Sequence, residues 1–248
     1  MSGHSKWHSI KHKKGAADAK RGKLFTKLIK EITISARLGG GDEESNPRLR
    51  TAVLKAKTAN MPKDNIDRAI KKGTGELEGV DYVQITYEAY GPGGVAILID
   101  ALTDNKNRTA ADIRNILGKG GGSLGDPGCV SYLFHRKGII AFSTEDVTEE
   151  QVFEVVLEAG AEDVATSGDT IEVITEPEDF EAVLSAVHKA GLPETMAEVS
   201  MVPDATVTLD KDKTGKALRL IEHIDDHDDI QSVSTNLEIP DDFEMEDE

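Results

Sequence analysis

The chain has a single cysteine, few aromatic residues and no long apolar run. Cys129 is its only cysteine, which excludes an internal disulfide and any multi-cysteine metal site and is typical of a reducing compartment. No stretch approaches the roughly 18 consecutive apolar residues that a transmembrane helix needs. The basic N-terminus has no apolar stretch behind it and therefore differs from a secretory signal. These absences predict a soluble, cytoplasmic protein that does not contact a membrane.

Basic residues gather at one end of the chain. The formal net charge is −17, yet the first 38 residues hold ten Lys or Arg and only two acidic residues. Counted through Lys72 the net charge is +11, which leaves −28 for the remainder. Clustered cations neutralise phosphates and release condensed counterions, whereas an acidic surface repels polyanions. We therefore expect a polyanion, either nucleic acid or the ribosome, to meet the N-terminal end.

The first 75 residues are predicted to form a basic arm and a small helical bundle. Residues 1–19 show no helical periodicity and are interpreted as an arm able to order on binding. From Lys20 apolar residues recur at helical spacing until a run of three glycines ends the pattern. A second helix starts at Asn46, a capping residue followed by proline, and a third ends at Gly73. Each helix has one narrow apolar face, so the three should pack together.

After residue 81 the apolar period changes to that of strands. The first predicted elements are strands at 82–89 and 95–102, a helix at 106–117, a glycine-rich loop at 118–125 and a strand at 129–134. The next elements follow the order βαββαβ of a ferredoxin-like unit. The chain then adds a helix at 216–224 and a strand at 230–235. A helix and a strand cannot bury their apolar faces alone, so we expect this pair to return to the first strands.

The predicted fold class is α+β, with an N-terminal three-helix domain followed by two α+β domains, at least one of them ferredoxin-like. The expected divisions are the arm and bundle at 1–75, a discontinuous central domain at 81–136 plus 204–240, an inserted ferredoxin-like domain at 137–203, and an acidic tail at 241–248.

The densest basic cluster lies in the arm and the first turns of the following helix. Trp7 is the only aromatic residue among its cations, so we expect phosphate contact without evident sequence readout. A second basic spot opens the helix at 106–117, where backbone N–H groups favour anions; ordinary capping by Asp104 or Asn105 explains this pattern equally well. The predicted nucleic-acid-binding residues are Lys6, Trp7, His8, Lys11, His12, Lys13, Lys14, Lys20, Arg21, Lys23, Lys106 and Arg108.

Histidines offer a metal site as an alternative interpretation. His4, His8 and His12 share a four-residue spacing, but the neighbouring lysines would repel a cation. His223 and His227 stand among four aspartates where a helix gives way to a strand. We expect those carboxylates, Asp225, Asp226, Asp228 and Asp229, to form a solvated corner instead of a metal site.

Residues 120–125 (GGGSLG) match the spelling G-x-G-x-x-G. They follow a helix and precede a strand, whereas a dinucleotide site needs the reverse order, so we interpret them as a connecting loop. No Ser/His/Asp or Cys/His set stands out, and Cys129 lies in an apolar segment where a thiol is usually inert. No cofactor, metal, catalytic residue or small-molecule substrate is therefore expected.

No predicted helix shows a clear base-reading face. The nearest candidate spans residues 46–60 and carries Arg48, Arg50, Lys55, Lys57 and Asn60. An acidic body with a cationic tip suits an RNA-lined cavity at least as well as a DNA duplex. DNA and ribosomal RNA thus both stay open as targets.

Seven motifs along the whole chain resemble those of the YebC family of bacterial proteins, whose mitochondrial relative is a translational activator of a cytochrome oxidase subunit. The motifs are GHSKW (3–7), IKHKK (10–14), DAKR (18–21), GPGG (91–94), TDNKNRT (103–109), GGSLG (121–125) and DDIQ (228–231).

The resemblance implies a helical N-terminal domain followed by two α+β domains, in a cytoplasmic protein that is not an enzyme. Members of the family are generally described as transcriptional regulators that bind DNA. Others are described as ribosome-associated factors that assist synthesis of proline-rich stretches. From the charge pattern and the resemblance together, the leading interpretation is a DNA-binding transcriptional regulator. The alternative is a translation factor that binds ribosomal RNA.

Overall fold

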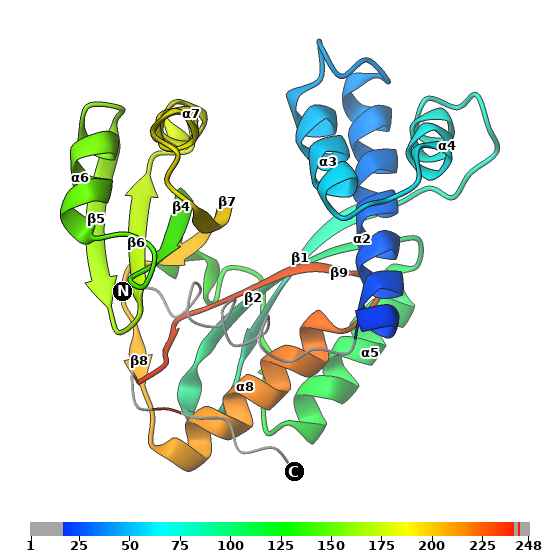
Figure 1. Ribbon diagram of the computed structural model, residues 1–248. Coiled ribbons are helices and arrows are strands. Elements are labelled where there is room, and N and C mark those ends of the chain that lie inside the picture. The colour runs from blue at the N-terminus through cyan, green and yellow to red at the C-terminus, as the bar shows by residue number, and fades with distance from the viewer. Residues whose placement is uncertain (1–16, 241–242, 244–248) are drawn as a thin grey trace.

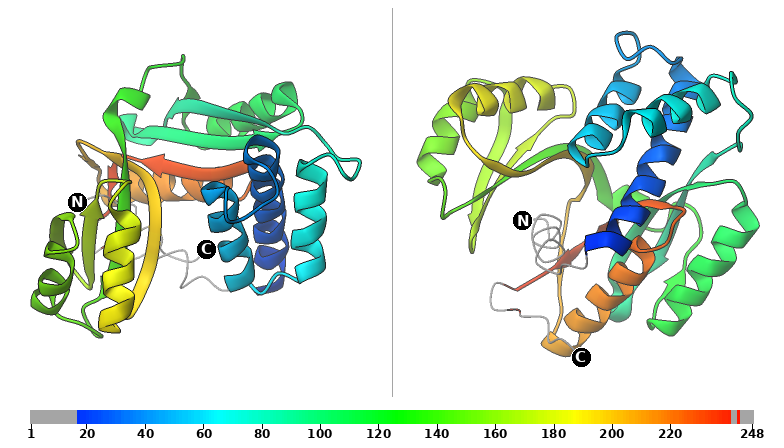
Figure 2. Two further views of the ribbon diagram at one scale, coloured as in Figure 1. Left: turned by 90° about the horizontal axis from the view of Figure 1, so that it is seen from above. Right: turned by 45° about the vertical axis from the view of Figure 1, so that its right-hand side comes forward.

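The computed structural model describes residues 17–240 and Phe243, so the predictions for residues 1–16 and for most of the acidic tail lie outside the described residues. The fold is α+β, as predicted, because a helical bundle precedes two units that are each built on a four-stranded sheet. Figures 1 and 2 show the bundle and the second of these units at opposite ends of a central layer. In the described part of the chain, no helix combines the length and apolar character needed to span a membrane.

Three helices form the bundle: α2 (Ala17–Gly39), α3 (Pro47–Thr58) and α4 (Lys63–Gly73). Helix α3 begins where Asn46 caps it, since the Asn46 side-chain oxygen accepts the Leu49 N–H at 3.1 Å. Ile32, Leu49 and Val53 are fully buried where the apolar faces of the helices meet. Helix α4 packs tightly on α2 because Gly73 has no side chain there: a Cβ at that position would lie 2.4 Å from the Thr33 carbonyl oxygen.

The central sheet has the strand order β3-β1-β2-β9. Its strands are β1 (Val83–Tyr90), β2 (Ala96–Thr103), β3 (Ser123–Leu124) and β9 (Ile230–Thr235). Helices α5 (Lys106–Lys119) and α8 (Lys211–Asp225) cover one face, where Ile99 and Ile221 are fully buried. Strand β9 pairs antiparallel with β2, so the last helix and strand complete the sheet that β1 and β2 begin.

The second sheet has the order β5-β6-β4-β7 and lies between β2 and α8 in the sequence. Its elements are β4 (Phe134–Ser143), α6 (Glu149–Leu157), β5 (Ala161–Ser167), β6 (Thr170–Thr175), α7 (Phe180–Ala190) and β7 (Glu194–Pro203). Thr148 and Gln151 form a capping box at the start of α6. We call residues 137–203 the inserted unit; the domain boundaries given above stay a prediction.

The strand predicted at residues 129–134 is wrong. Residues Ser131–Leu133 form a 3-10 turn, and β4 begins only at Phe134. The N–H groups of Val130 and Ser131 donate to the Glu88 carboxylate, at 2.7 and 2.8 Å, so they cannot join a strand ladder.

Helix α8 and a pair of short strands also differ from the sequence prediction. Helix α8 begins at Lys211, earlier than the predicted residue 216, because Asp210 accepts the Lys213 N–H at 2.9 Å and caps it. A short parallel pair, β8 (Val207–Thr208) with β10 (Leu237–Glu238), was not anticipated. Two-residue strands are too short for any periodic pattern, so the sequence holds no signal for them.

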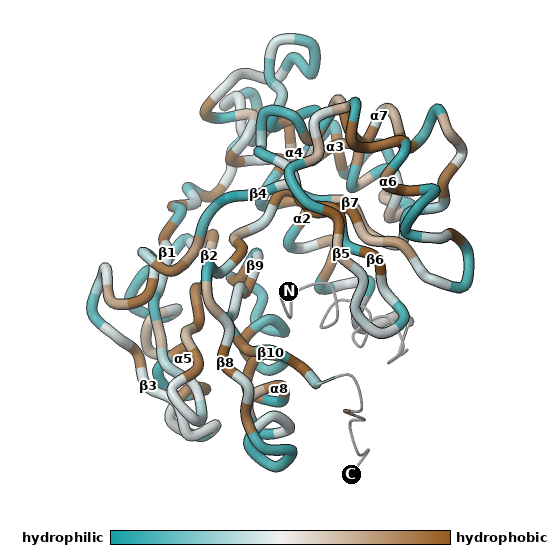
Figure 3. Tube along the Cα trace, turned by 90° about the vertical axis from the view of Figure 1, so that its left-hand side faces the viewer, coloured by the Kyte–Doolittle hydropathy of each residue, from teal (hydrophilic) through white to brown (hydrophobic). Residues whose placement is uncertain are grey.

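One face of the central sheet is not covered by α5 and α8. Residues of β1 alternate between the faces, and Gln84, Thr86, Glu88 and Tyr90 point away from the helices. We call this side the open face. It reaches from the bundle, where the Arg48 guanidinium donates to Gln84, towards the base of β4. Figure 3 shows hydrophobic residues concentrated in strands and inner helix positions, with hydrophilic residues in the turns.

Candidate nucleic-acid interface

Three lysines of α2 lie along one side of the helix and contact the end of α8. Lys23, Lys27 and Lys30 are spaced so that they project in the same direction. Helix α8 ends at Asp225, where the terminal carbonyl groups carry the negative end of the helix dipole. Lys27 Nζ donates to the Asp225 carbonyl oxygen at 2.6 Å and to its carboxylate at 3.1 Å. Helix α2 is thereby fixed to the C-terminal part of the chain.

Lys30 and Asp229 form the most buried ion pair of this contact. Lys30 Nζ lies 2.6 Å from Asp229 Oδ1, and the two side chains are 10% and 4% exposed. The second carboxylate oxygen accepts from Thr109 at 2.7 Å and from Arg108 at 2.9 Å. Burial alone would raise the pKa of Asp229, but hydrogen bonds from Lys30, Arg108 and Thr109 outweigh it and hold the pKa well below its usual range. Asp229 is therefore ionised at neutral pH.

The prediction that four aspartates form a solvated corner is wrong for two of them. Asp226 and Asp228 are exposed, as expected. Asp225 and Asp229 are buried, because lysines of α2 lie against them and supply the counter-charge. The sequence carried a signal for this contact, since a stripe of lysines at helical spacing needs partners if it faces a packed surface.

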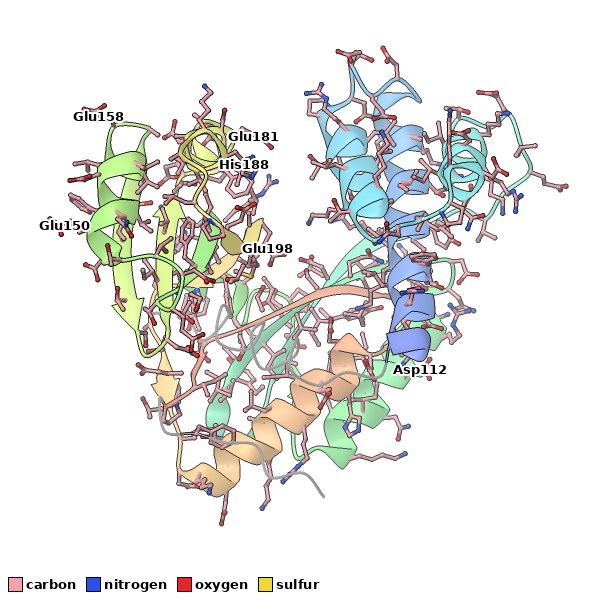
Figure 4. All side chains as sticks on the ribbon, viewed as in Figure 1. Asp112, Glu150, Glu158, Glu181, His188 and Glu198 are labelled. Atoms are coloured by element: carbon pink, nitrogen blue, oxygen red, sulfur yellow. The ribbon has the colours of Figure 1, made fainter. Side chains whose placement is uncertain are left out.

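Both ring nitrogens of His227 have hydrogen-bond partners. Nδ1 accepts the Asp229 N–H at 3.1 Å, and Nε2 faces Asp112 Oδ2 at 3.3 Å. Figure 4 labels Asp112 on α5, next to the first turn of α2. Within residues 17–240 and Phe243, no group of three or more His, Cys, Asp or Glu is arranged to hold a metal ion.

A carboxylate of the chain itself, that of Asp229, lies at the start of α5. Asn105 caps this helix by accepting the Arg108 N–H at 3.1 Å. The Arg108 guanidinium donates to Asp104 at 2.7 Å and to Asp229 at 2.9 Å. Lys106 is exposed and forms no ion pair with another described residue. Of the two predicted contacts here, Arg108 is bound by two carboxylates, whereas Lys106 keeps its charge unmatched.

A groove of about 530 Å³ lies between α2 and this corner. Its charged lining consists of Lys23, Lys30, Asp104, Arg108, Asp226, Asp228 and Asp229. Each cation of the lining has a carboxylate partner within 3.2 Å. The groove therefore offers no surplus positive charge to a phosphate.

The remaining predicted site residues fall into two groups. Lys6, Trp7, His8, Lys11, His12, Lys13 and Lys14 lie outside the described residues, as does the side chain of Lys20. Arg21 is exposed on the first turns of α2. Lys23 pairs with Asp226 at 3.2 Å, although both side chains stay about half exposed. Their contact with nucleic acid stays a prediction.

The bundle also exposes cations outside the predicted set. Lys55 on α3 and Lys63, Arg68 and Lys71 on α4 are exposed, and none forms an ion pair with another described residue. The signal for them was the net charge of +11 through Lys72, which extends well past the arm. These residues enlarge the positive surface that the sequence placed mainly in the arm. We call these four residues the bundle cations.

The two arginines of α3 are held by the bundle. Arg48 donates to the Glu31 carboxylate at 2.8 Å and 3.2 Å. The Arg50 guanidinium donates to the carbonyl oxygens of Glu43 and Glu44, at 2.9 and 2.8 Å. Arginine recognises guanine by donating two hydrogen bonds from its guanidinium group. In Arg48 and Arg50 these donors are already used within the bundle. The helix at residues 46–60 therefore supplies charge at Lys55 and no arginine poised for base reading.

Two family models match the chain. The TACO1/YebC protein N-terminal domain matches residues 5–76, and the TACO1/YebC second and third domain matches residues 82–237. A relative from Treponema denticola is 62% identical over 245 residues, which is 99% of each chain, and is named a probable transcriptional regulatory protein. A relative from Desulforapulum autotrophicum with the same descriptive name is 61% identical and covers 97% of this chain and 98% of its own.

A solved structure has the same fold. The crystal structure of a conserved hypothetical protein from Aquifex aeolicus superposes with a TM-score of 0.81 at 48% identity, over 92% of this chain and 94% of that one. The order of bundle, central sheet and inserted unit is thus shared with an experimentally determined relative. On the match of both models and the identity of these relatives over nearly their full length, the chain belongs to the TACO1/YebC family.

Proposed function

We propose that this chain is a regulatory protein that binds DNA through its basic N-terminal end and is not an enzyme. The observation that carries the proposal is the separation of charge. The bundle cations are exposed and unmatched among the described residues, whereas the inserted unit has a net charge of −14. Figure 4 labels Glu150, Glu158 and Glu181 on α6 and α7, far from the bundle. The names of its relatives, probable transcriptional regulatory proteins, support the same role.

The presence or absence of a carboxylate partner separates the cations that hold the bundle in place from those that are available to nucleic acid. Lys27 is half-buried and Lys30 is buried; both lie against aspartates and hold the bundle in place. Unpaired surface cations contact phosphates through long, flexible side chains, and phosphate contacts carry no sequence information by themselves. We expect tight, salt-sensitive binding with weak preference among sequences.

The test is the affinity of the full chain for a fluorescent DNA duplex, measured by anisotropy across a range of salt concentrations. A variant with Lys55, Lys63, Arg68 and Lys71 all replaced by Ala should bind more weakly, and the slope of log affinity against log salt should flatten by about 1 for each phosphate that the variant no longer neutralises. Lys189→Ala, which removes an exposed cation from the inserted unit, is the matched control and should leave binding unchanged. Equal affinity of both variants and the parent would contradict a contact at the bundle.

Ribosomal RNA is the second candidate target, and one observation favours it. Arg48 and Arg50 are occupied, so α3, the helix nearest to a base-reading pattern in the sequence, presents no free arginine to a major groove. Ribosome profiling of a deletion strain separates the two roles. Pauses at proline-rich stretches with unchanged promoter occupancy would support translation and contradict transcriptional regulation.

A further inference from the structure

A buried carboxylate on the open face holds a surface turn in one conformation. Glu88 of β1 is only 8% exposed. Its carboxylate accepts N–H groups from Gly128 at 2.6 Å, Val130 at 2.7 Å and Ser131 at 2.8 Å, and its backbone carbonyl accepts the Gly125 N–H at 2.8 Å. Glu88 thus accepts four hydrogen bonds, which fix the turn between β3 and β4.

The Glu88 carboxylate is ionised in this buried position. Burial of the Glu88 carboxylate opposes its ionisation, and the three backbone N–H groups outweigh that effect and lower the pKa of Glu88. Removing a carboxylate from water is costly unless its hydrogen bonds are replaced in full, as they are here. A buried charge therefore orders a turn that buries Val130 and exposes Tyr132.

The ordered turn presents two tyrosine rings. Tyr132 is 68% exposed, the joint highest exposure among the large hydrophobic residues that the structure describes, and Tyr90 beside it is 38% exposed. The Tyr90 hydroxyl donates to the Cys129 carbonyl oxygen at 3.0 Å, which fixes that ring against the turn. Partial burial raises the pKa of the Tyr90 phenol, with Cys129 and then Tyr132 contributing, as expected for neighbouring groups.

The two rings lie on the same side of the sheet as the bundle. Gln84 and Tyr90 occupy the same face of β1, six residues and about 20 Å apart. Gln84 contacts Arg48 of the bundle, so a strand of nucleic acid held at the bundle reaches Tyr90 by following β1. The polar surface between them includes Thr86, whose hydroxyl donates to Asp100 at 2.7 Å.

We propose that Tyr132 and Tyr90 form a stacking platform for an unpaired base of a nucleic acid that the bundle binds. The proposal rests on the proposed function and adds a second contact to it. Aromatic rings stack on the flat faces of bases without distinguishing their sequence, and a rigid platform loses little entropy on binding. The ligand class is single-stranded nucleic acid, whether an RNA loop or melted DNA.

The test uses the full chain and a 12-nucleotide single strand, as RNA and as DNA, each with and without abasic sites in place of its central bases. The abasic strands keep every phosphate and remove the stacking partner. Tyr132→Ala should weaken binding of the intact strands about tenfold and leave binding of the abasic strands unchanged. Tyr132→Phe keeps the ring and should bind like the parent. Phe153→Ala removes another exposed ring, from the inserted unit, and is the control.

The outcomes separate the platform from the proposed function. If the parent binds intact and abasic strands equally and Tyr132→Ala changes neither, the platform is wrong while phosphate binding stands. If the parent binds no strand at low salt, the proposed function fails with it. Photocrosslinking of an iodouracil-containing strand gives an independent answer: an adduct on Tyr132 or Tyr90 supports the platform, and adducts confined to other residues overturn it. A preference for the RNA or the DNA strand identifies the source of the unpaired base.

Discussion

Lys30 and Asp229 lie nearly 200 residues apart in the sequence and form an ion pair at 2.6 Å. Lys30 belongs to the basic helix α2, and Asp229 immediately precedes β9, the last strand of the central sheet. The same aspartate accepts from Arg108 and Thr109 at the start of α5. A single carboxylate thus joins three segments of the chain and sets where the positive bundle stands relative to the acidic remainder.

Replacing Lys30 by Met should destabilise the protein by about 3 kcal/mol. Breaking a buried ion pair costs this much because a buried charge loses its partner. The expected loss is at the lower end of the known range, since Arg108 and Thr109 still donate hydrogen bonds to Asp229. Urea unfolding measures the difference. Lys23→Met, in a half-exposed pair with Asp226, is the control and should cost less than about 1 kcal/mol. Equal effects of the two substitutions would show that burial of the Lys30 pair has no energetic weight.

Stability should fall as the pH drops below about 4, and Asp229 should account for part of the fall. The pKa of Asp229 is held below its ordinary value of about 3.9, so the unfolded chain takes up a proton there before the folded chain does. Its contribution is fully present above that pH and is lost as the pH falls towards the folded pKa. Unfolding free energies measured from pH 2.5 to 6 should decline less steeply for Asp229→Asn than for the parent. Asp226→Asn, at an exposed position, should follow the parent; identical curves for all three proteins would contradict the account.

Gly73→Ala should destabilise the bundle by about 1–3 kcal/mol. The added methyl group would lie 2.4 Å from the Thr33 carbonyl oxygen and 2.7 Å from Ala36 Cβ, so α4 would have to move away from α2. Gly22→Ala is the matched control on α2, where a Cβ meets nothing within 4 Å. That substitution should stabilise the helix by up to about 1 kcal/mol. Thermal unfolding of both variants tests the close approach, and a stable Gly73→Ala protein would rule it out.

Most elements of the fold could be predicted because their signals are local. Helix α3 follows a capping residue and a proline, and the strands β1 and β2 alternate around a glycine-rich turn. The segment at 129–134 was predicted as a strand because it is apolar. Its backbone N–H groups are instead taken by Glu88, about forty residues earlier, and no local pattern reports such a contact.

The positive charge of the candidate interface and its location could be predicted from the sequence, whereas the ion pairs of its cations could not. Net charge placed a positive surface at the N-terminal end, and exposed residues such as Lys55 and Lys71 agree with it. Charge counting could not show that Lys27 and Lys30 are paired with aspartates, because their partners come from the far end of the chain. Likewise, the sequence prediction for Arg108 considers only the start of its own helix. Its ion-pair partner Asp229 is distant in the sequence and comes close to it only in the folded central sheet.

The most direct test of the account is the salt dependence of nucleic-acid affinity for the full chain and for a variant with Lys11, Lys13, Lys14, Lys20 and Arg21 replaced by Ala. If the basic end neutralises roughly five to eight phosphates, log affinity should fall against log salt with a slope of about −4 to −7. The variant should lose binding while its thermal stability stays nearly unchanged. A parent affinity that is almost independent of salt, or a variant that unfolds, would contradict the claim that these charges serve to bind a polyanion.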